Sequence, residues 1–285
     1  MIPGLSKASP GSDTRSAPLF VADRLAVTVA TLLLAAAAIS WAATYLLMPL
    51  MEVPSGMMGM GVAAIVSSLS PTSLSVFDLV WVVGMAAMMF PAMLPLVLFY
   101  NKVVTRTESN QRRIQIAGTP ILLSGYLATY AGLGIAAYVA VFVALGLTSS
   151  VPALSALAVV GPGLVLIVAG IYQLTPLKAR CLSYCASPVG FFAMHSGKGL
   201  SGAFGMGIKH GTYCVGCCWA YMLVMLVVAA MSIPFMAVLA GVIAVEKVMV
   251  RGSTWFVRVI ASAFLLLGIA SFFFPVVLSY FSLGI

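Results

Sequence analysis

The cysteines of this chain are gathered into one segment, together with a histidine. The five are Cys181, Cys185, Cys214, Cys217 and Cys218. On a helix, His210, Cys214 and Cys218 recur every four residues and share one face, whereas Cys217 points to one side, where it could meet another segment. Cys181 and Cys185 repeat the same spacing. Thiols and an imidazole in this arrangement predict either a site for a soft metal ion or a redox site.

The number of sulfur ligands bears on which metal ion would bind. Several soft sulfur atoms favour Cu(I), and Zn(II) becomes the rival once an imidazole joins them. The alternative is that the cysteines are buried simply as small apolar side chains. Because all five lie in one segment with His210 in phase, the pattern favours a ligand or redox role.

Methionines supply a second set of soft ligands. Met88 and Met89 lie in an apolar run with Pro91 and Pro95, which should kink a helix there. A methionine-rich stretch precedes this run and contains Met51, Met57, Met58 and Met60. These residues predict a series of thioether ligands leading toward the cysteines, although methionine is also a common packing residue.

The composition indicates the environment that must hold these residues. The chain of 285 residues is 62% hydrophobic and 7% charged, which predicts an all-α polytopic membrane protein. Residues 1–24 are rich in Pro, Gly, Ser and charge and read as a disordered cytoplasmic tail, followed by a transmembrane helical domain over residues 25–285. About seven spans are expected, near residues 25–50, 76–100, 114–147, 154–174, 211–231, 235–249 and 256–275. The first is too long for a signal peptide and is expected to remain as an anchor.

The basic residues predict an orientation. All 14 Lys and Arg residues fall in the N-terminal tail or on alternate loops, which is the positive-inside pattern. The N-terminus is therefore expected in the cytoplasm and the C-terminus outside. This pattern assigns the net charge of +8 to membrane orientation and not to nucleic-acid binding. It also places residues 210–218 at the cytoplasmic end of the fifth span, where thiols stay reduced.

One acidic residue, Glu246, is expected at the inner end of the sixth span, beside Lys247. An acid in a membrane span is costly, which suggests a ligand or proton role, but Glu246 could also pair with Lys247 or another base. No Ser-His-Asp grouping, close carboxylate pair or nucleotide-binding motif is present, so neither hydrolysis nor ATP-driven pumping is indicated and the protein is not expected to be an enzyme.

Four segments of the chain resemble a bacterial family of predicted metal-binding integral membrane proteins, DUF2182. They are residues 88–95, residues 172–185 with Cys181 and Cys185, residues 210–219, and Glu246 with Lys247. The resemblance implies metal handling in the bacterial inner membrane. It also implies that the partner is a copper-dependent enzyme, such as a tyrosinase or laccase, or a metallochaperone; homo- and hetero-oligomers are both compatible with it.

Three hypotheses follow. In the first, the protein captures, transfers or transports Cu(I) for maturation of a copper enzyme, through Cys181, Cys185, His210, Cys214, Cys217, Cys218, Met88, Met89 and Glu246. In the second, cysteine pairs such as Cys181 with Cys185, or Cys217 with Cys214 or Cys218, shuttle electrons. In the third, the protein is a structural subunit of a membrane complex in which the cysteines only pack.

Overall fold

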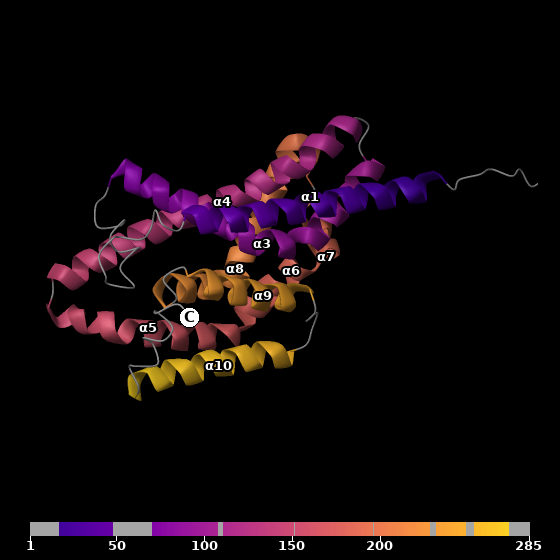
Figure 1. Ribbon diagram of the computed structural model, residues 1–285. Helices are drawn as coiled ribbons and strands as arrows, with labels where there is room; N and C mark the ends of the chain where they lie inside the picture. Colours follow the sequence, from indigo (N-terminus) through magenta and orange to yellow (C-terminus); the bar gives the residue numbers. More distant parts are fainter. Residues whose placement is uncertain are drawn as a thin grey trace, which may run out of the picture.

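The protein is built from helices throughout its described part. The computed structural model describes residues 17–47, 70–107, 111–150, 152–195, 197–228, 232–248 and 254–273. These ranges contain nine helices and no strand (Figure 1). The all-α fold class expected from the composition is therefore confirmed.

Seven of the helices are long, and two are short. The long ones are α1 (Ala17–Leu47), α3 (Pro71–Thr107), α4 (Gln111–Ser150), α5 (Pro152–Gln173), α8 (Gly199–Val227), α9 (Ile233–Val248) and α10 (Thr254–Phe273). The short helices α6 (Pro176–Ala186) and α7 (Pro188–Met194) connect α5 to α8. Helix α1 begins earlier than expected and includes residues 17–24, which the sequence suggested were part of the tail.

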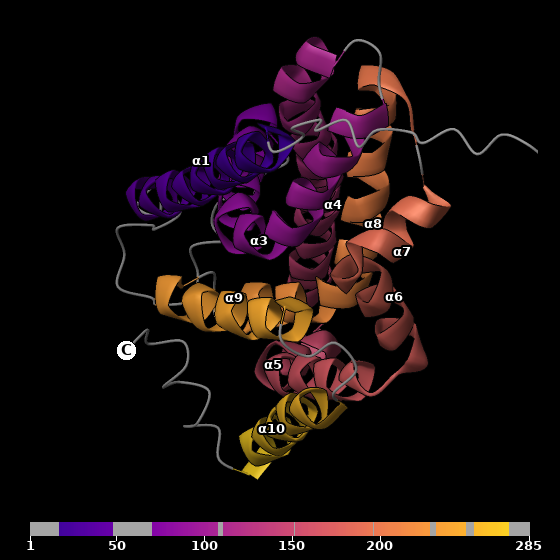
Figure 2. The same cartoon turned by 90° about the vertical axis from the view of Figure 1, so that its right-hand side faces the viewer.

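The centre of the bundle is formed by α3 and α8. In each of these two helices, 61% of the 18-residue apolar stretch that could cross a membrane is buried inside the protein. The corresponding share is 11% in α1 and α4 and 17% in α10. Helix α1 lies along α3, and α10 lies along α5 at the opposite edge (Figures 1 and 2). The outer helices expose large apolar side chains, such as Leu46 of α1 and Phe273 of α10. Such surfaces are compatible with lipid rather than water.

Helices α4 and α8 approach each other closely because glycines lie at their contact. A Cβ atom added to Gly207 would collide with the carbonyl oxygen of Leu122, and one added to Gly211 would lie 2.7 Å from Thr129 Oγ1. Gly207 and Gly211 are four residues apart, which is the small-residue spacing that lets membrane helices pack closely. The glycines thus fix the face that α8 turns toward α4.

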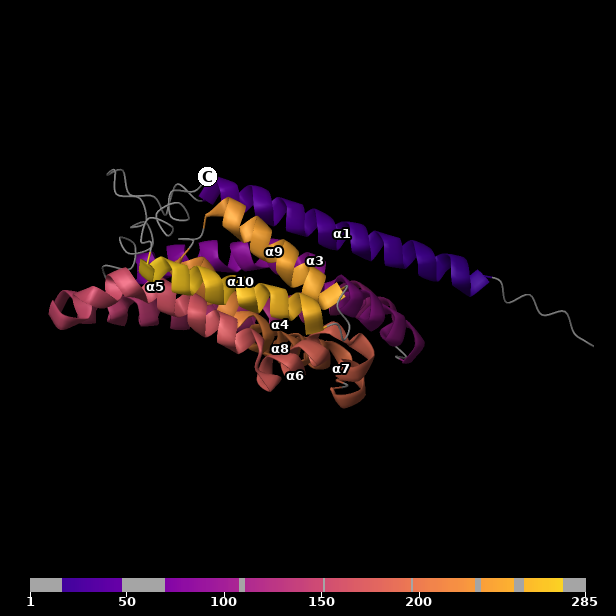
Figure 3. The same ribbon diagram turned by 90° about the horizontal axis from the view of Figure 1, so that it is seen from below.

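The connection between α5 and α8 is helical, although the sequence suggested a loop. Helix α5 ends at Gln173 and α6 starts after a bend of 68°. Thr175 caps α6, since its hydroxyl accepts from the Lys178 backbone N–H at 3.3 Å, and Pro176 occupies the first helical turn. Ser187 and Pro188 begin α7 in the same way. Helix α6 packs against α8, and α7 lies beside α6 in Figure 3.

The number of spans differs from the seven expected. Five helices are long and apolar enough to cross a membrane, and the bent pair α5–α6 raises the number to six at most within the described ranges. Helix α9 has only 16 residues. At about 1.5 Å per residue it is shorter than the hydrocarbon core of roughly 30 Å. The bundle is that of a multi-pass membrane protein, with five or six candidate spans.

Helix α8 also differs from its expected bounds. It starts at Gly199, so His210 to Cys218 lie near its middle and not at its end. Residues 199–210 were expected to lie outside the fifth span, but in the bundle they are helical, and Gly207 and Gly211 allow contact with α4. Helix α3 continues through Pro91 and Pro95. The methionine-rich stretch from Met51 to Met60 lies outside the described residues.

Candidate metal site

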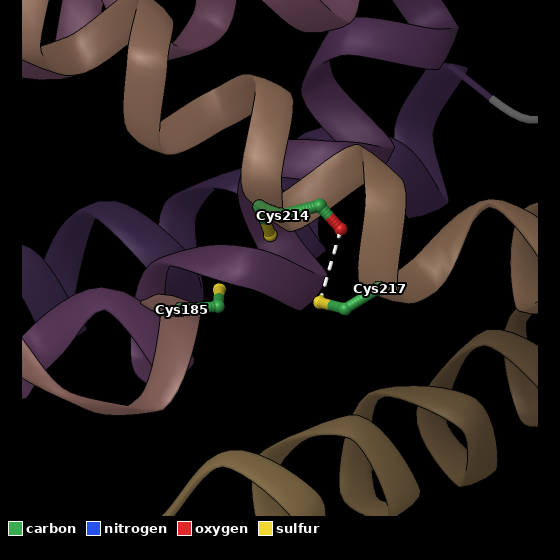
Figure 4. A group of neighbouring side chains, drawn as sticks. All are labelled: Cys185, Cys214 and Cys217. Atoms are coloured by element: carbon green, nitrogen blue, oxygen red, sulfur yellow. Dashed lines mark hydrogen bonds between the residues drawn. The ribbon is translucent and has the colours of Figure 1, made fainter. Parts of the chain in front are cut away.

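Three thiols from two helices converge inside the bundle. Cys185 of α6 and Cys214 and Cys217 of α8 place their Sγ atoms within 4.8 Å of one another. Figure 4 shows the three sulfur atoms pointing toward a common space between the two helices. All three side chains are buried, and all five cysteines of the chain are free thiols. Cys217 therefore does meet another segment, as its position off the main row suggested.

Close packing between α6 and α8 makes this convergence possible. Gly216 of α8 faces α6, because a Cβ atom at this position would lie 2.8 Å from Cys181 Sγ. The hydroxyl of Tyr172, at the end of α5, donates a hydrogen bond to the carbonyl oxygen of Gly216. The same turn of α8 is therefore contacted by both α5 and α6. Cys181 thus packs against the α8 backbone, is partly exposed and does not belong to the group of three thiols.

His210 and Cys218 adjoin the three thiols. The Nε2 atom of His210 lies 3.8 Å from Cys185 Sγ, and the Sγ atom of Cys218 lies 3.3 Å from Cys217 Sγ. The thiol of Cys217 also donates to the carbonyl oxygen of Cys214 at 3.1 Å, shown as the dashed line in Figure 4. The helical row expected from the spacing of residues 210, 214 and 218 is buried along its whole length.

Cys214 has a strongly polar environment. The ammonium nitrogen of Lys247 donates to its Sγ atom at 2.8 Å, and the Tyr130 hydroxyl donates at 3.0 Å. The hydroxyl of Tyr126 lies 3.1 Å from the same sulfur. A cation and hydroxyl donors stabilise negative charge on sulfur, which is the form that binds metal ions. Cys214 is therefore the thiol of the group best prepared to act as a thiolate.

The two methionines expected at the site have different positions. Met89 of α3 lies beside it, since its Sδ atom is 3.9 Å from the Lys247 nitrogen that contacts Cys214. Met88 is also buried, in the core that contains Met89 and the thiols, and its contact with the thiols stays a prediction. The structure thus brings the Met89 thioether into contact with the ammonium of Lys247, which itself contacts the thiol group.

Glu246 lies next to Lys247 in sequence but faces a different set of partners. Both of its carboxylate oxygens accept from Lys178 Nζ at 2.9 Å, and Oε1 also accepts from the Tyr221 hydroxyl at 2.6 Å. The side chains of Lys178 and Glu246 are 1% and 2% exposed. This buried ion pair connects α6 to α9, and Glu246 is not among the grouped thiols.

Sequence reasoning missed several of the residues that surround the thiols. Tyr126 and Tyr130 were not singled out, although two tyrosines four residues apart in an apolar helix bring two hydroxyls that need partners. Lys178 was used only as a marker of orientation, and Lys247 was considered as a partner of Glu246 but not of a thiol. The signal was their position at the ends of apolar runs, but whether a lysine there extends outward or inward depends on packing.

The separation of the three thiols is slightly larger than the one a bound soft ion requires. Metal–thiolate bonds are about 2.3 Å long, so three sulfurs in a plane around one ion lie roughly 4 Å apart. The observed spread of 4.8 Å is close to this value. Three sulfurs without oxygen ligands suit Cu(I), while a tetrahedral Zn(II) ion would also need a neighbour such as His210 or Cys218.

Comparison with known proteins bears on which kind of ion such a site would hold. No curated protein and no solved structure matches the chain. Residues 79–271 match the family PpoB2, whose description is copper chaperone, and this range includes the three grouped cysteines and Lys247. The match extends over more than half of the chain and confirms the expected relation to copper-handling proteins, while the DUF2182 name rests on the sequence resemblance alone. The chain therefore belongs to the PpoB2 family of copper chaperones.

Proposed function

We propose that the protein is a membrane copper chaperone that holds Cu(I) between Cys185, Cys214 and Cys217 and passes it to a copper-dependent enzyme. The observation that carries this proposal is the convergence of three buried thiols within 4.8 Å. Membership of a copper chaperone family supports copper as the cargo. In this proposal the protein is not an enzyme, because copper only exchanges one set of ligands for another.

The residues around the thiols support reversible binding of Cu(I). Thiolates supply affinity for Cu(I), and an apolar bundle keeps water away from the ion. Met89 and Cys218 offer further sulfur atoms at the edge of the group, and the thioether is the weaker ligand of the two. Weak ligands beside strong ones allow copper to leave by stepwise exchange.

The ammonium of Lys247 contributes to the charge balance in this proposal. Three thiolates and one Cu(I) ion would carry net negative charge inside an apolar bundle, which is costly. A cation 2.8 Å from Cys214 Sγ offsets part of that charge. The protein would accordingly bind copper in a site that is already partly neutralised.

The basic residues around the connection between α3 and α4, and Lys198 before α8, support an orientation with the N-terminus in the cytoplasm, and the family resemblance supports the bacterial inner membrane. In that orientation the chaperone would receive Cu(I) in a compartment where thiols are reduced. The partner would be a copper enzyme or another metallochaperone.

Copper binding by the purified full-length protein tests the proposal. Under reducing and oxygen-free conditions, the wild type should bind one Cu(I) ion per chain in competition with a chromophoric Cu(I) chelator. The triple variant Cys185→Ser/Cys214→Ser/Cys217→Ser should lose this ion. Cys181→Ser is the matched control, because Cys181 lies outside the group, and it should bind as the wild type does. A wild-type protein with intact thiols that binds no copper would reject the proposal.

A thiol-redox protein is the second candidate, and the closeness of Cys214 and Cys217 favours it. Their Sγ atoms lie within 4.8 Å of each other. Oxidation would join the two sulfurs and release two protons and two electrons to an external disulfide oxidant. Mass mapping of the thiols in membranes prepared with and without reductant distinguishes the candidates, because an unchanged set of five thiols excludes the redox function.

A purely structural role makes a different prediction in cells. If the thiols only pack, a copper enzyme that depends on this protein should remain fully active when the triple serine variant replaces the wild type at equal abundance. If copper is delivered from the thiols, that enzyme should lose its copper and its activity. Copper content and protein level measured together separate the two.

A further inference from the structure

The chain contains two histidines, and both contact the same phenylalanine ring. His195 follows α7 and stacks on Phe191, with ring centroids 5.2 Å apart and planes at 23°. His210 meets that ring edge-on from α8, with a centroid distance of 5.2 Å and planes at 86°. The fold thus brings both imidazoles of the protein to one place, although α7 and α8 are separate helices.

Each imidazole has a buried nitrogen without a partner. Among the described residues, the Nδ1 atoms of His195 and His210 have no hydrogen bond. The side chain of His210 is 1% exposed, and the other nitrogen of its ring faces Cys185. A buried polar atom left unpaired lowers stability and calls for an explanation, and a transient ligand would supply one.

The two histidines differ in how deeply they are buried. From the surface inward, His195 comes first, His210 second and the thiols last. His195 is partly exposed, next to the exposed side chain of Met194 at the end of α7. His210 is fully buried, with Nε2 at 3.8 Å from Cys185 Sγ. Cys185 in turn belongs to the group with Cys214 and Cys217. Neutral imidazole is a good ligand for copper and binds less strongly than thiolate, which suits an ion in transit.

We infer that His195 and His210 form the route by which Cu(I) reaches and leaves the three thiols. His195 is the outer ligand, His210 is the inner ligand, and Phe191 lies against both. In the last step inward, the copper–nitrogen bond at His210 breaks as the bond to Cys185 Sγ forms. Copper stays Cu(I), and the proton lost by Cys185 is taken up by the nitrogen of His210 that copper leaves. This inference rests on the proposed function, since it concerns access to the same site.

The rate of copper uptake separates a transit ligand from a ligand of the final site. A residue that contacts copper only on the way changes the barrier, so it slows binding and release equally and leaves the affinity unchanged. Rapid mixing of reduced full-length protein with a chromophoric Cu(I)–chelator complex gives the uptake rate, and equilibrium titration gives the affinity. His195→Gln should slow uptake about tenfold at unchanged affinity and unchanged copper per chain.

Lys198→Gln is the matched control. Lys198 is an exposed residue of the same connector between α7 and α8, and its side chain makes no cap hydrogen bond there. This variant should load copper at the wild-type rate. If His195→Gln loads as fast as the wild type, the route is rejected. It is also rejected if affinity falls by the same factor as the uptake rate, because His195 would then contribute to the bound state.

A second measurement looks for copper held by the histidines themselves. In the Cys185→Ser/Cys214→Ser/Cys217→Ser variant, copper should stall on nitrogen ligands with weak affinity, visible by X-ray absorption. Adding His195→Gln and His210→Gln should remove that signal. If the thiol-free variant shows no nitrogen-bound copper while the wild type loads normally, the route is wrong and the proposed function stands. If the wild type itself binds no copper, the proposed function fails first.

Discussion

Lys247 of α9 donates a hydrogen bond of 2.8 Å to the Sγ atom of Cys214 on α8, so the candidate metal site contains its own cation. The neighbouring residue, Glu246, binds Lys178 of α6 at 2.9 Å. Two adjacent residues of α9 thus contact the two helices that carry the thiols. Helix α9 is therefore more important to the site than its length suggests.

The first prediction concerns the ammonium of Lys247. Lys247→Met keeps the apolar stem and removes the charge, so Cu(I) affinity should fall about 10–100-fold, the usual effect of losing a residue that supports a metal ligand. Lys247→Arg restores a cation and should recover part of the affinity. Chelator competition on both variants is the measurement. Equal affinity in wild type and Lys247→Met would show that the cation has no role in binding.

The second prediction concerns the hydroxyl that Tyr130 donates to Cys214 Sγ at 3.0 Å. Tyr130→Phe keeps the ring packed and removes the donor, which should cost about 0.5–1.5 kcal/mol of stability in the copper-free protein. Thermal unfolding in detergent measures this loss. Tyr45→Phe on the exposed face of α1 is the control and should leave the melting temperature unchanged. If Tyr130→Phe and Tyr45→Phe have the same melting temperature, the Tyr130 hydroxyl does not stabilise the protein through Cys214.

The third prediction concerns the ion pair between Lys178 and Glu246. Glu246→Gln leaves a buried ammonium without its counter-ion and should destabilise the protein by about 3–5 kcal/mol. Removing both charges in Lys178→Met/Glu246→Gln should recover a large part of that loss, because no charge stays buried alone.

The same double variant decides whether Glu246 is a metal ligand. If the carboxylate serves only as the partner of Lys178, the folded double variant should bind Cu(I) with wild-type affinity and stoichiometry. A loss of copper in a variant that remains folded by circular dichroism would assign Glu246 to the metal site itself.

The fourth prediction concerns the contact between α6 and α8. A Cβ atom at Gly216 would lie 2.8 Å from Cys181 Sγ but 3.5 Å from Cys181 Cβ. Gly216→Ala should therefore destabilise the protein by about 1–3 kcal/mol through overpacking. Cys181→Ala in the same chain removes the clashing sulfur and should restore most of the stability. If the double variant is no more stable than Gly216→Ala, the contact is not what excludes a side chain there.

The sequence determined the class of fold and the kind of chemistry. Apolar composition and few charges are sufficient to predict membrane helices, because no soluble domain hides so much apolar surface. Regular spacing determined that His210, Cys214 and Cys218 share a face of α8, since helical geometry is local. The residue types alone pointed to a site for a soft metal ion or to a redox site.

Tertiary structure decided which of these residues meet. Sequence spacing treats Cys181 and Cys185 alike, yet only Cys185 joins Cys214 and Cys217, because the bend between α5 and α6 and the contact at Gly216 set the rotation of α6. The sequence suggested that Glu246 pairs with Lys247 or another base, but only the packing identifies that base as Lys178 and brings Lys247 to Cys214, since contacts between helices far apart in the chain leave no local pattern. Periodicity places a side chain on a face, but the packing of one helix on another decides what that face touches.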